Sequence, residues 1–204
     1  DVIYHLDYPV AGPGSFPQYH VSALAAKHRK VVLGGDGGDE IFGGYPRYYY
    51  SMLLDKYQLL PEFLRKNILP VFLERFLKKE NLGYKLNVPR SIDRYLLFMS
   101  EHDETLREVL RPSVSNINPE FFLNYFPQNK FKDFSKYLMY LDLTMWLADE
   151  SLMRSDKMTM AHGLEERVPI LDHRLIELAF RIPTKFKIGR GNNNKMIFRK
   201  AMAN

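Results

Sequence analysis

Residues 31–45, VVLGGDGGDEIFGGY, combine side chains that rarely share one loop. Three apolar residues are followed, within residues 34–40, by four glycines and three acids. A glycine-rich loop after a strand typically binds phosphate through backbone N–H groups, whereas carboxylates repel phosphate. A divalent cation resolves this conflict, because Mg²⁺ can bridge carboxylate and phosphate oxygens. The loop therefore indicates a site for a phosphate compound and Mg²⁺, in which a remaining acid can act as a base.

The common phosphate- and metal-binding motifs do not fit this loop. A Walker loop needs Gly-Lys-Ser/Thr after its glycines, and a dinucleotide fingerprint counted from Gly35 meets Glu40 where a third glycine is required. Residues 36–40 also lack the spacing of a calcium-binding EF-hand loop. A structural interpretation stays open, in which the loop is an acidic turn, Asp39 is a helix N-cap and Glu40 favours the helix N-terminus.

Composition narrows the class of protein. The 204 residues contain no cysteine, which excludes disulfides, thiolate metal sites and cysteine nucleophiles within them and fits a reducing, cytoplasmic setting. No run of 18 apolar residues predicts a membrane span, and no signal-peptide pattern opens the chain. The net charge is +5, but basic and acidic residues are mixed, so we expect a solvated surface rather than a nucleic-acid-binding one. The histidines lack the spacing of a zinc site.

Apolar patterns predict the elements that must position the loop. We expect a short strand at 2–6, a helix at 16–28 with Val21, Leu24 and Ala25 on one face, and a buried strand at 31–33. A helix followed by a short apolar strand is one piece of a parallel α/β sheet. The following chain is predicted to be mainly helical, with helices near 47–57, 62–79, 91–101, 103–110, 119–126, 134–147 and 149–161.

The last third carries clear helix boundary signals. Gly163 is suited to end the preceding helix in a left-handed cap, and Asp172 is suited to N-cap the next one. A final helix is expected to begin near Asn194. The helix after Asp172 places four residues at core spacing: Leu175, Ile176, Leu178 and Ala179.

Three segments in the same order resemble one family. LGGDGGDEIFGGY is similar to L-S-G-(D/E)-G-x-D-E-(L/I/V)-F-G-G-Y of the asparagine synthetase domain, the ATP-dependent half of glutamine-hydrolysing asparagine synthetases. Residues 152–183 resemble its second block, D-(R/K)-M-(S/T)-M-A followed by G-x-E-x-R-(V/T)-P-(F/L/I)-L-D. KMIFRKA at 195–201 resembles the closing K-x-(I/L)-(L/F)-R-x-A, and DYPVAGPGSFPQY resembles the D-(E/Q)-P segment before the acidic loop.

The resemblance implies an α/β parent fold, adenine nucleotide alpha hydrolase-like with a doubly wound parallel sheet. Residues 1–204 would form the C-terminal portion of the synthetase domain, mostly α-helical with one or two short strands. The family's Ser-Gly-Gly-x-Asp-Ser ATP loop and the N-terminal cysteine of its glutaminase half do not occur here. We therefore expect both to lie outside this chain and the chain alone to be inactive.

The resemblance also implies a reaction. ATP and Mg²⁺ activate a carboxylate, first of all that of aspartate, as an acyl-adenylate, and ammonia derived from glutamine attacks it to give asparagine, AMP and pyrophosphate. Related β-lactam synthetases, lasso-peptide cyclases and polysaccharide amidotransferases use other acceptors and stay open. A non-catalytic module that binds protein or RNA is the alternative from a different class. We expect neither a membrane nor a nucleic acid as a partner. Whether the protein forms a homodimer is left open.

The resemblance also implies roles for individual residues that stand at positions matching the family segments. Asp36 would be the base that holds and deprotonates ammonia, Asp39 would ligate Mg²⁺, and Glu40 would support the metal or the loop. Lys195 would neutralise charge between the α-phosphate and the leaving pyrophosphate. Backbone contacts to phosphate would come from four glycines: Gly34, Gly35, Gly37 and Gly38. Gly34 stands where serine is common in the family. Glu165 and Arg167 are expected to form a buried ion pair or to line the acceptor pocket.

Overall fold

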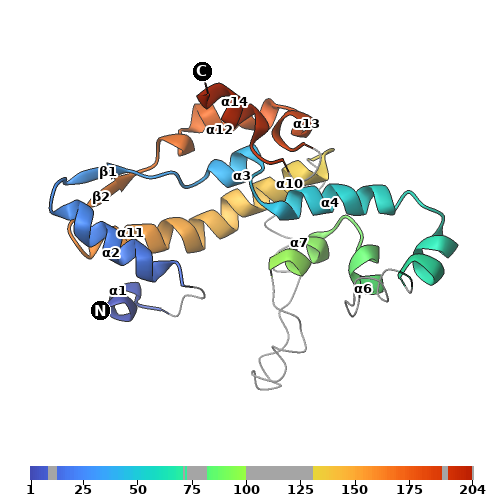
Figure 1. Ribbon diagram of the computed structural model, residues 1–204, viewed down its shortest axis with the longest axis horizontal. Coiled ribbons are helices and arrows are strands. Elements are labelled where there is room, and N and C mark those ends of the chain that lie inside the picture. The colour runs from blue at the N-terminus through green and yellow to red at the C-terminus, as the bar shows by residue number, and fades with distance from the viewer. Residues whose placement is uncertain (9–12, 71, 73–81, 100–130, 190–192, 204) are drawn as a thin grey trace. The chain divides into compact units, whose positions relative to one another are not determined.

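The computed structural model describes residues 1–8, 13–70, 72, 82–99, 131–189 and 193–203 (Figure 1). The chain divides into two compact units, residues 1–45 with 139–204 and residues 46–138. The described residues are mostly helical and include a two-stranded parallel sheet, which confirms the expected content of this chain. The doubly wound sheet of the parent fold stays a prediction. Within the described part, no helix is long and apolar enough to cross a membrane.

The sheet of the first unit pairs β1 (Val31–Leu33) with β2 (Glu165–Arg167) in parallel. The ladder continues into the acidic loop, because the Gly34 N–H donates to the Arg167 carbonyl oxygen at 2.8 Å. The predicted strand at 31–33 is therefore confirmed, but the prediction that it is buried is wrong. Val31 is 44% exposed and Leu33 is 74% exposed, because no described element covers the face on which they lie.

Two helices precede the sheet. The expected strand at 2–6 is wrong: Val2–Leu6 is helix α1, which packs on α2 and α11 and buries Leu6. Helix α2 (Ser15–Ala26) confirms the helix expected at 16–28 and lies alongside α11 (Figure 1). Its predicted apolar face stays largely exposed, with Val21 at 65% and Leu24 at 59%, and the residues that α2 buries are serines.

One continuous helical run replaces the two helices predicted at 134–147 and 149–161. It consists of α10 (Phe134–Leu141), the π-helical segment η4 (Asp142–Leu152) and α11 (Met153–Met160). A π-helical turn widens the spacing of side chains and often occurs at functional sites. Gly163 follows with φ 62°, which confirms the predicted left-handed residue at the end of this run.

The C-terminal part of the first unit contains η5 (Pro169–Leu171), α12 (His173–Arg181), α13 (Thr184–Lys187) and α14 (Met196–Met202). The predicted cap at the start of α12 is confirmed, because the Asp172 side chain accepts from the Arg174 N–H at 2.9 Å. The Arg174 guanidinium, and to a smaller extent this backbone bond, lower the pKa of Asp172. Ala179 is buried as predicted, whereas Leu178 is 55% exposed, so its placement in the core is wrong.

The second unit contains α4 (Pro46–Tyr57), η1 (Leu64–Ile68), α6 (Leu82–Asn87), α7 (Ile92–Met99) and the start of α10. The helix predicted at 47–57 is confirmed, and the helix predicted at 91–101 is confirmed over its described residues as α7. The helix expected at 62–79 is described only in part and includes the π-helical segment η1. The helices expected at 103–110 and 119–126 lie outside the described residues.

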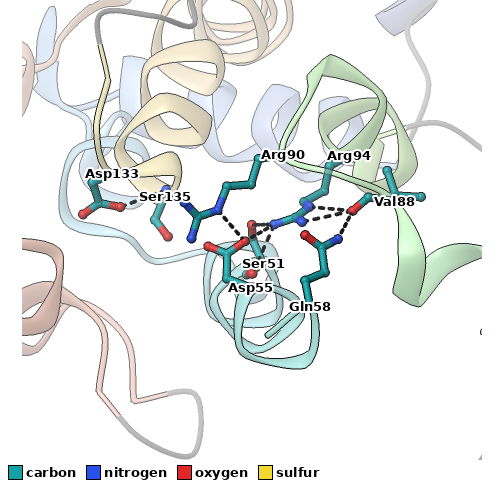
Figure 2. Close-up of polar contacts among 8 residues, drawn as sticks. All are labelled: Ser51, Asp55, Gln58, Val88, Arg90, Arg94, Asp133 and Ser135. Atoms are coloured by element: carbon teal, nitrogen blue, oxygen red, sulfur yellow. Dashed lines mark hydrogen bonds and ion pairs between the residues drawn. The ribbon is translucent and has the colours of Figure 1, made fainter. Parts of the chain in front are cut away.

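A buried arginine organises the second unit (Figure 2). Arg94 is fully buried, and its Nη1 lies 2.5 Å from Asp55 Oδ1 on α4. Its Nη2 donates to the Val88 carbonyl oxygen at 3.0 Å, and the Gln58 amide donates to the same oxygen at 2.6 Å. Arg90 adds a second ion pair to Asp55 at 2.9 Å. The network ties α4 to α7 and to the turn that precedes α7.

Candidate active site

The acidic loop continues into a short helix, α3 (Gly38–Phe42), which is packed by its neighbours in the first unit. Elements η4, α12 and α14 all contact α3. Ile41 and Phe42 are buried with Ala179, and the Phe42 ring stacks on Phe198 of α14 at 4.8 Å between centroids. The apolar side of α3 thus fixes the helix, and its acidic first turn is held in a defined position.

Glycine is required at both ends of α3. Gly37 is the N-cap residue with φ 85°, and a Cβ there would overlap Leu171 of η5. The proposed N-cap role of Asp39 is therefore wrong, since Asp39 lies in the first turn of the helix. Gly44 follows α3, and a Cβ at this position would overlap the Asp39 carboxylate. These two glycines allow the backbone to fold tightly around that carboxylate.

Asp39 and Lys195, which lie far apart in sequence, meet in the structure. Lys195 Nζ is 2.9 Å from Asp39 Oδ1, and the side chains are 27% and 40% exposed. Lys195 precedes the first residue of α14 and has φ 54°, an unfavourable conformation for a residue with a side chain. Backbone strain of this kind is concentrated at functional sites. The structure thus brings together the predicted metal ligand and the predicted phosphate-binding cation.

Asp36 contacts a residue that the sequence did not single out. Its Oδ1 accepts a hydrogen bond of 2.8 Å from Ser151 Oγ, and Ser151 on η4 is only 9% exposed. This bond occupies one carboxylate oxygen and holds the side chain in one orientation.

Glu40 occupies a different environment from the two aspartates. It is 2% exposed, and its Oε1 accepts a hydrogen bond of 2.7 Å from the Tyr45 hydroxyl. Burial raises the pKa of Glu40, and the nearby Asp39 and Asp142 charges raise it further, while the Tyr45 hydroxyl opposes the shift. A buried, hydrogen-bonded carboxyl of this kind is more consistent with the predicted support of the loop than with the predicted support of the metal.

The predicted phosphate-binding glycines are not equivalent. A Cβ at Gly35 would meet no atom within 4 Å, so the backbone there is open to a ligand. Gly38 is buried, and its nearest side chain is that of Ile170. At Gly34 a Cβ would overlap the Glu166 carboxylate of β2, so a serine in place of this glycine would require the Glu166 side chain to move.

Glu166 belongs to a polar network that sequence reasoning missed. Its Oε2 accepts a hydrogen bond from Ser155 Oγ of α11, and Gln18 Nε2 of α2 donates to the same hydroxyl at 2.6 Å. By contrast, Arg167 and Glu165 form their expected ion pair at 2.9 Å with side chains 66% and 54% exposed. The expected burial of that pair is therefore wrong, because both side chains extend from β2 into solvent.

Asp39 is the predicted Mg²⁺ ligand, and its surroundings can be compared with what Mg²⁺ requires. Within the part of the chain that the structure describes, no group of three or more His, Cys, Asp or Glu side chains could hold a metal. Mg²⁺, however, is usually bound by one or two carboxylates together with water and substrate phosphates. The partly exposed Asp39 carboxylate could act as one such ligand, whereas the Glu40 carboxyl is 2% exposed and accepts a hydrogen bond from Tyr45.

Comparison with known proteins identifies the family. Residues 1–204 match the family model described as Asparagine synthase. The chain therefore belongs to the asparagine synthase family, as the three sequence segments predicted.

Curated relatives agree with this assignment. The chain is 32% identical to "Asparagine synthetase [glutamine-hydrolyzing] 1" of Bacillus subtilis, over 98% of this chain and 32% of the relative. It is 33% identical to a "Putative asparagine synthetase [glutamine-hydrolyzing]" of Mycobacterium tuberculosis (strain H37Rv), over 99% of this chain and 31% of the relative. The chain thus spans about a third of the length of these relatives. No solved structure gave a significant match.

Proposed function

We propose that this chain forms the pyrophosphate-releasing part of an amide-forming ligase, which adenylates the side-chain carboxylate of aspartate and lets ammonia convert it to asparagine. The observation that carries this proposal is the 2.9 Å contact between Lys195 Nζ and Asp39 Oδ1. It joins the first and last of the three family segments in one place. Family membership and the names of the relatives support the choice of reaction.

In this proposal Asp39 and Lys195 act on the phosphates of ATP. Mg²⁺ bound at Asp39 would neutralise charge on the β- and γ-phosphates and orient the leaving pyrophosphate. Lys195 would exchange its ion pair with Asp39 for a contact with the phosphates and stabilise the charge that develops when pyrophosphate leaves. The open backbone at Gly35 would supply N–H groups to the same anion.

Asp36 would serve the second half of the reaction. Ammonia at neutral pH is mainly ammonium, which is not a nucleophile, so a carboxylate must hold it and take its proton. The bond from Ser151 Oγ fixes Asp36 Oδ1 and orients the other oxygen for this contact. The attack on the acyl-adenylate then forms the amide and releases AMP.

Other acceptors and a non-catalytic role are weaker alternatives. The relatives are named as asparagine synthetases, which favours aspartate over the acceptors of β-lactam synthetases, peptide cyclases or polysaccharide amidotransferases. A module that only binds protein or RNA would not need a lysine and an aspartate held together with a hydrogen-bonded second aspartate.

The test is exchange between ATP and labelled pyrophosphate, measured on the full polypeptide that carries these residues, because the ATP loop of the family does not occur in residues 1–204. Exchange should require Mg²⁺ and aspartate and should be absent with glutamate. Asp39→Asn should shift the Mg²⁺ titration to higher concentration, whereas Glu177→Gln, which changes an exposed acid of α12, should not. Exchange that responds to another carboxylate would reject aspartate, and superimposable Mg²⁺ curves would reject the metal role of Asp39.

A further inference from the structure

Two consecutive residues before α14 contact the end of the acidic loop. Lys195 Nζ lies 2.9 Å from Asp39 Oδ1, and Asn194 Nδ2 donates to the Gly44 carbonyl oxygen at 2.6 Å. The Gly44 N–H in turn donates to the Asp39 carbonyl oxygen at 2.8 Å. The Asn194 side chain therefore binds the residue that closes the backbone around Asp39.

Asn194 is anchored at a point that lies directly against Asp39. Gly44 cannot carry a side chain, because a Cβ there would overlap the Asp39 carboxylate. Asn194 is 8% exposed, so water competes little for its hydrogen bond to the Gly44 carbonyl. Its Oδ1 is buried and has no hydrogen-bond partner among the described residues. The amide therefore contributes to the described structure through its N–H donor.

The position of the Lys195 ammonium depends on its backbone. A lysine side chain has a flexible four-carbon stem, so its charge is well placed only if the stem starts from a fixed point. Lys195 has φ 54° and ψ 33°, a conformation that a residue with a Cβ adopts only when its surroundings impose it. The neighbouring bond from Asn194 to Gly44 supplies such a constraint.

The geometry points to Asn194 as a positioning residue for Lys195. The Asn194 amide anchors the chain to Gly44 and so sets the place from which the ammonium reaches a pyrophosphate group beside Asp39. This inference rests on the proposed function, in which Lys195 binds pyrophosphate. In this role Asn194 does not itself contact the substrate.

The test is calorimetric titration of the full polypeptide with inorganic pyrophosphate in the presence of Mg²⁺, which needs no turnover. Asn194→Ala removes the whole amide, and Asn194→Asp keeps the shape of the side chain but removes the donor and adds a negative charge, which Asn193→Asp adds as well. Each should weaken binding by about 3- to 10-fold, the usual effect of one lost hydrogen bond. Asn193→Asp and Asn193→Ala, at the exposed neighbouring position, should bind as the wild type does. Melting temperatures identify any variant that fails to fold.

A double-mutant cycle separates positioning from general support. Lys195→Met should weaken pyrophosphate binding by itself, and Asn194→Ala, which adds no charge, should then add little in the Lys195→Met background. Equal losses in both backgrounds, or Asn194 variants that bind like the Asn193 variants, would overturn the role of Asn194. A wild type that does not bind pyrophosphate, or Lys195→Met binding that equals the wild type, would instead overturn the proposed function and this inference with it.

Discussion

The hydrogen bond between Ser151 and Asp36 links η4 to the proposed ammonia step. Ser151→Ala should lower amide formation by about 10-fold, because Asp36 loses the donor that orients it, while ATP–pyrophosphate exchange stays near the wild-type rate. Ser151→Thr, which keeps a hydroxyl, should recover part of the loss. Both rates are measured on the full polypeptide.

Ser155→Ala is the matched control for this prediction. Ser155 is also a buried serine of the same helical run, but its hydroxyl contacts Glu166 instead of Asp36. If Ser151→Ala and Ser155→Ala reduced exchange and amide formation alike, the effect would be structural and Ser151 would not position Asp36.

The buried Glu40 should make stability depend on pH. Its pKa is raised above the ordinary value of 4.5, so the folded state binds more protons than the unfolded state once the pH exceeds that value. Wild-type stability should therefore fall as pH rises from 4.5 through the folded-state pKa. Glu40→Gln should lack this pH-dependent loss. Its free energy of unfolding relative to that of the wild type should therefore increase as pH rises. Urea unfolding of both proteins between about pH 4 and pH 8 measures the difference, and parallel pH curves would contradict the raised pKa.

Residue types in motifs could be predicted, but their partners could not. Asp36, Asp39 and Lys195 were assigned because acids and lysine in these segments resemble a family pattern, and the structure brings Asp39 and Lys195 into contact. Ser151 and Glu166 gave no signal, because a serine or glutamate that makes a tertiary hydrogen bond looks in sequence like any polar residue on a helix or strand.

At the scale of elements, the turn into α3 depends on Gly37. Gly37→Ala would impose φ 85° on a residue with a Cβ and overlap Leu171, which should destabilise the protein by about 2–4 kcal/mol. Gly35→Ala is the control, since its Cβ would meet open space. It should leave stability nearly unchanged and impair ATP–pyrophosphate exchange if phosphate approaches the backbone there. Equal losses of stability in urea unfolding would show that the turn is not constrained as described.

Elements with local signals were predicted well. Helices α2, α4 and α7 form where helices are predicted, and the Asp172 cap rests on a side chain that accepts a hydrogen bond from the N–H two residues further along. The sequence predicts a strand where the structure has helix α1, because five residues hold too little periodicity to distinguish a strand from a helix. Exposure of Val21 and Leu33 could not be predicted, since burial depends on tertiary neighbours and not on the pattern of an element.

At the scale of the whole molecule, each unit has its own stabilising interactions, and Arg94 is central to the second. Arg94→Met should destabilise this unit by about 3–5 kcal/mol, because it leaves the mostly buried Asp55 without its closest partner. Arg90→Met removes a pair whose arginine is 55% exposed and should cost at most about 1 kcal/mol. In limited proteolysis of the Arg94→Met variant, the first cleavage should fall within residues 46–138. Similar losses for both variants would contradict the central role of Arg94.

The central claim is that the acidic loop and Lys195 form one site that serves two successive half-reactions. The most direct measurement compares ATP–pyrophosphate exchange and amide formation in the full polypeptide with Lys195→Met, Asp36→Asn and the control Lys200→Met, an exposed lysine on α14. We predict that Lys195→Met loses both activities by about 10²–10³-fold. Asp36→Asn should keep most exchange but lose amide formation by about 10²–10⁴-fold, and Lys200→Met should resemble the wild type. Equal loss of both activities in folded Asp36→Asn, or full exchange in Lys195→Met, would contradict this account.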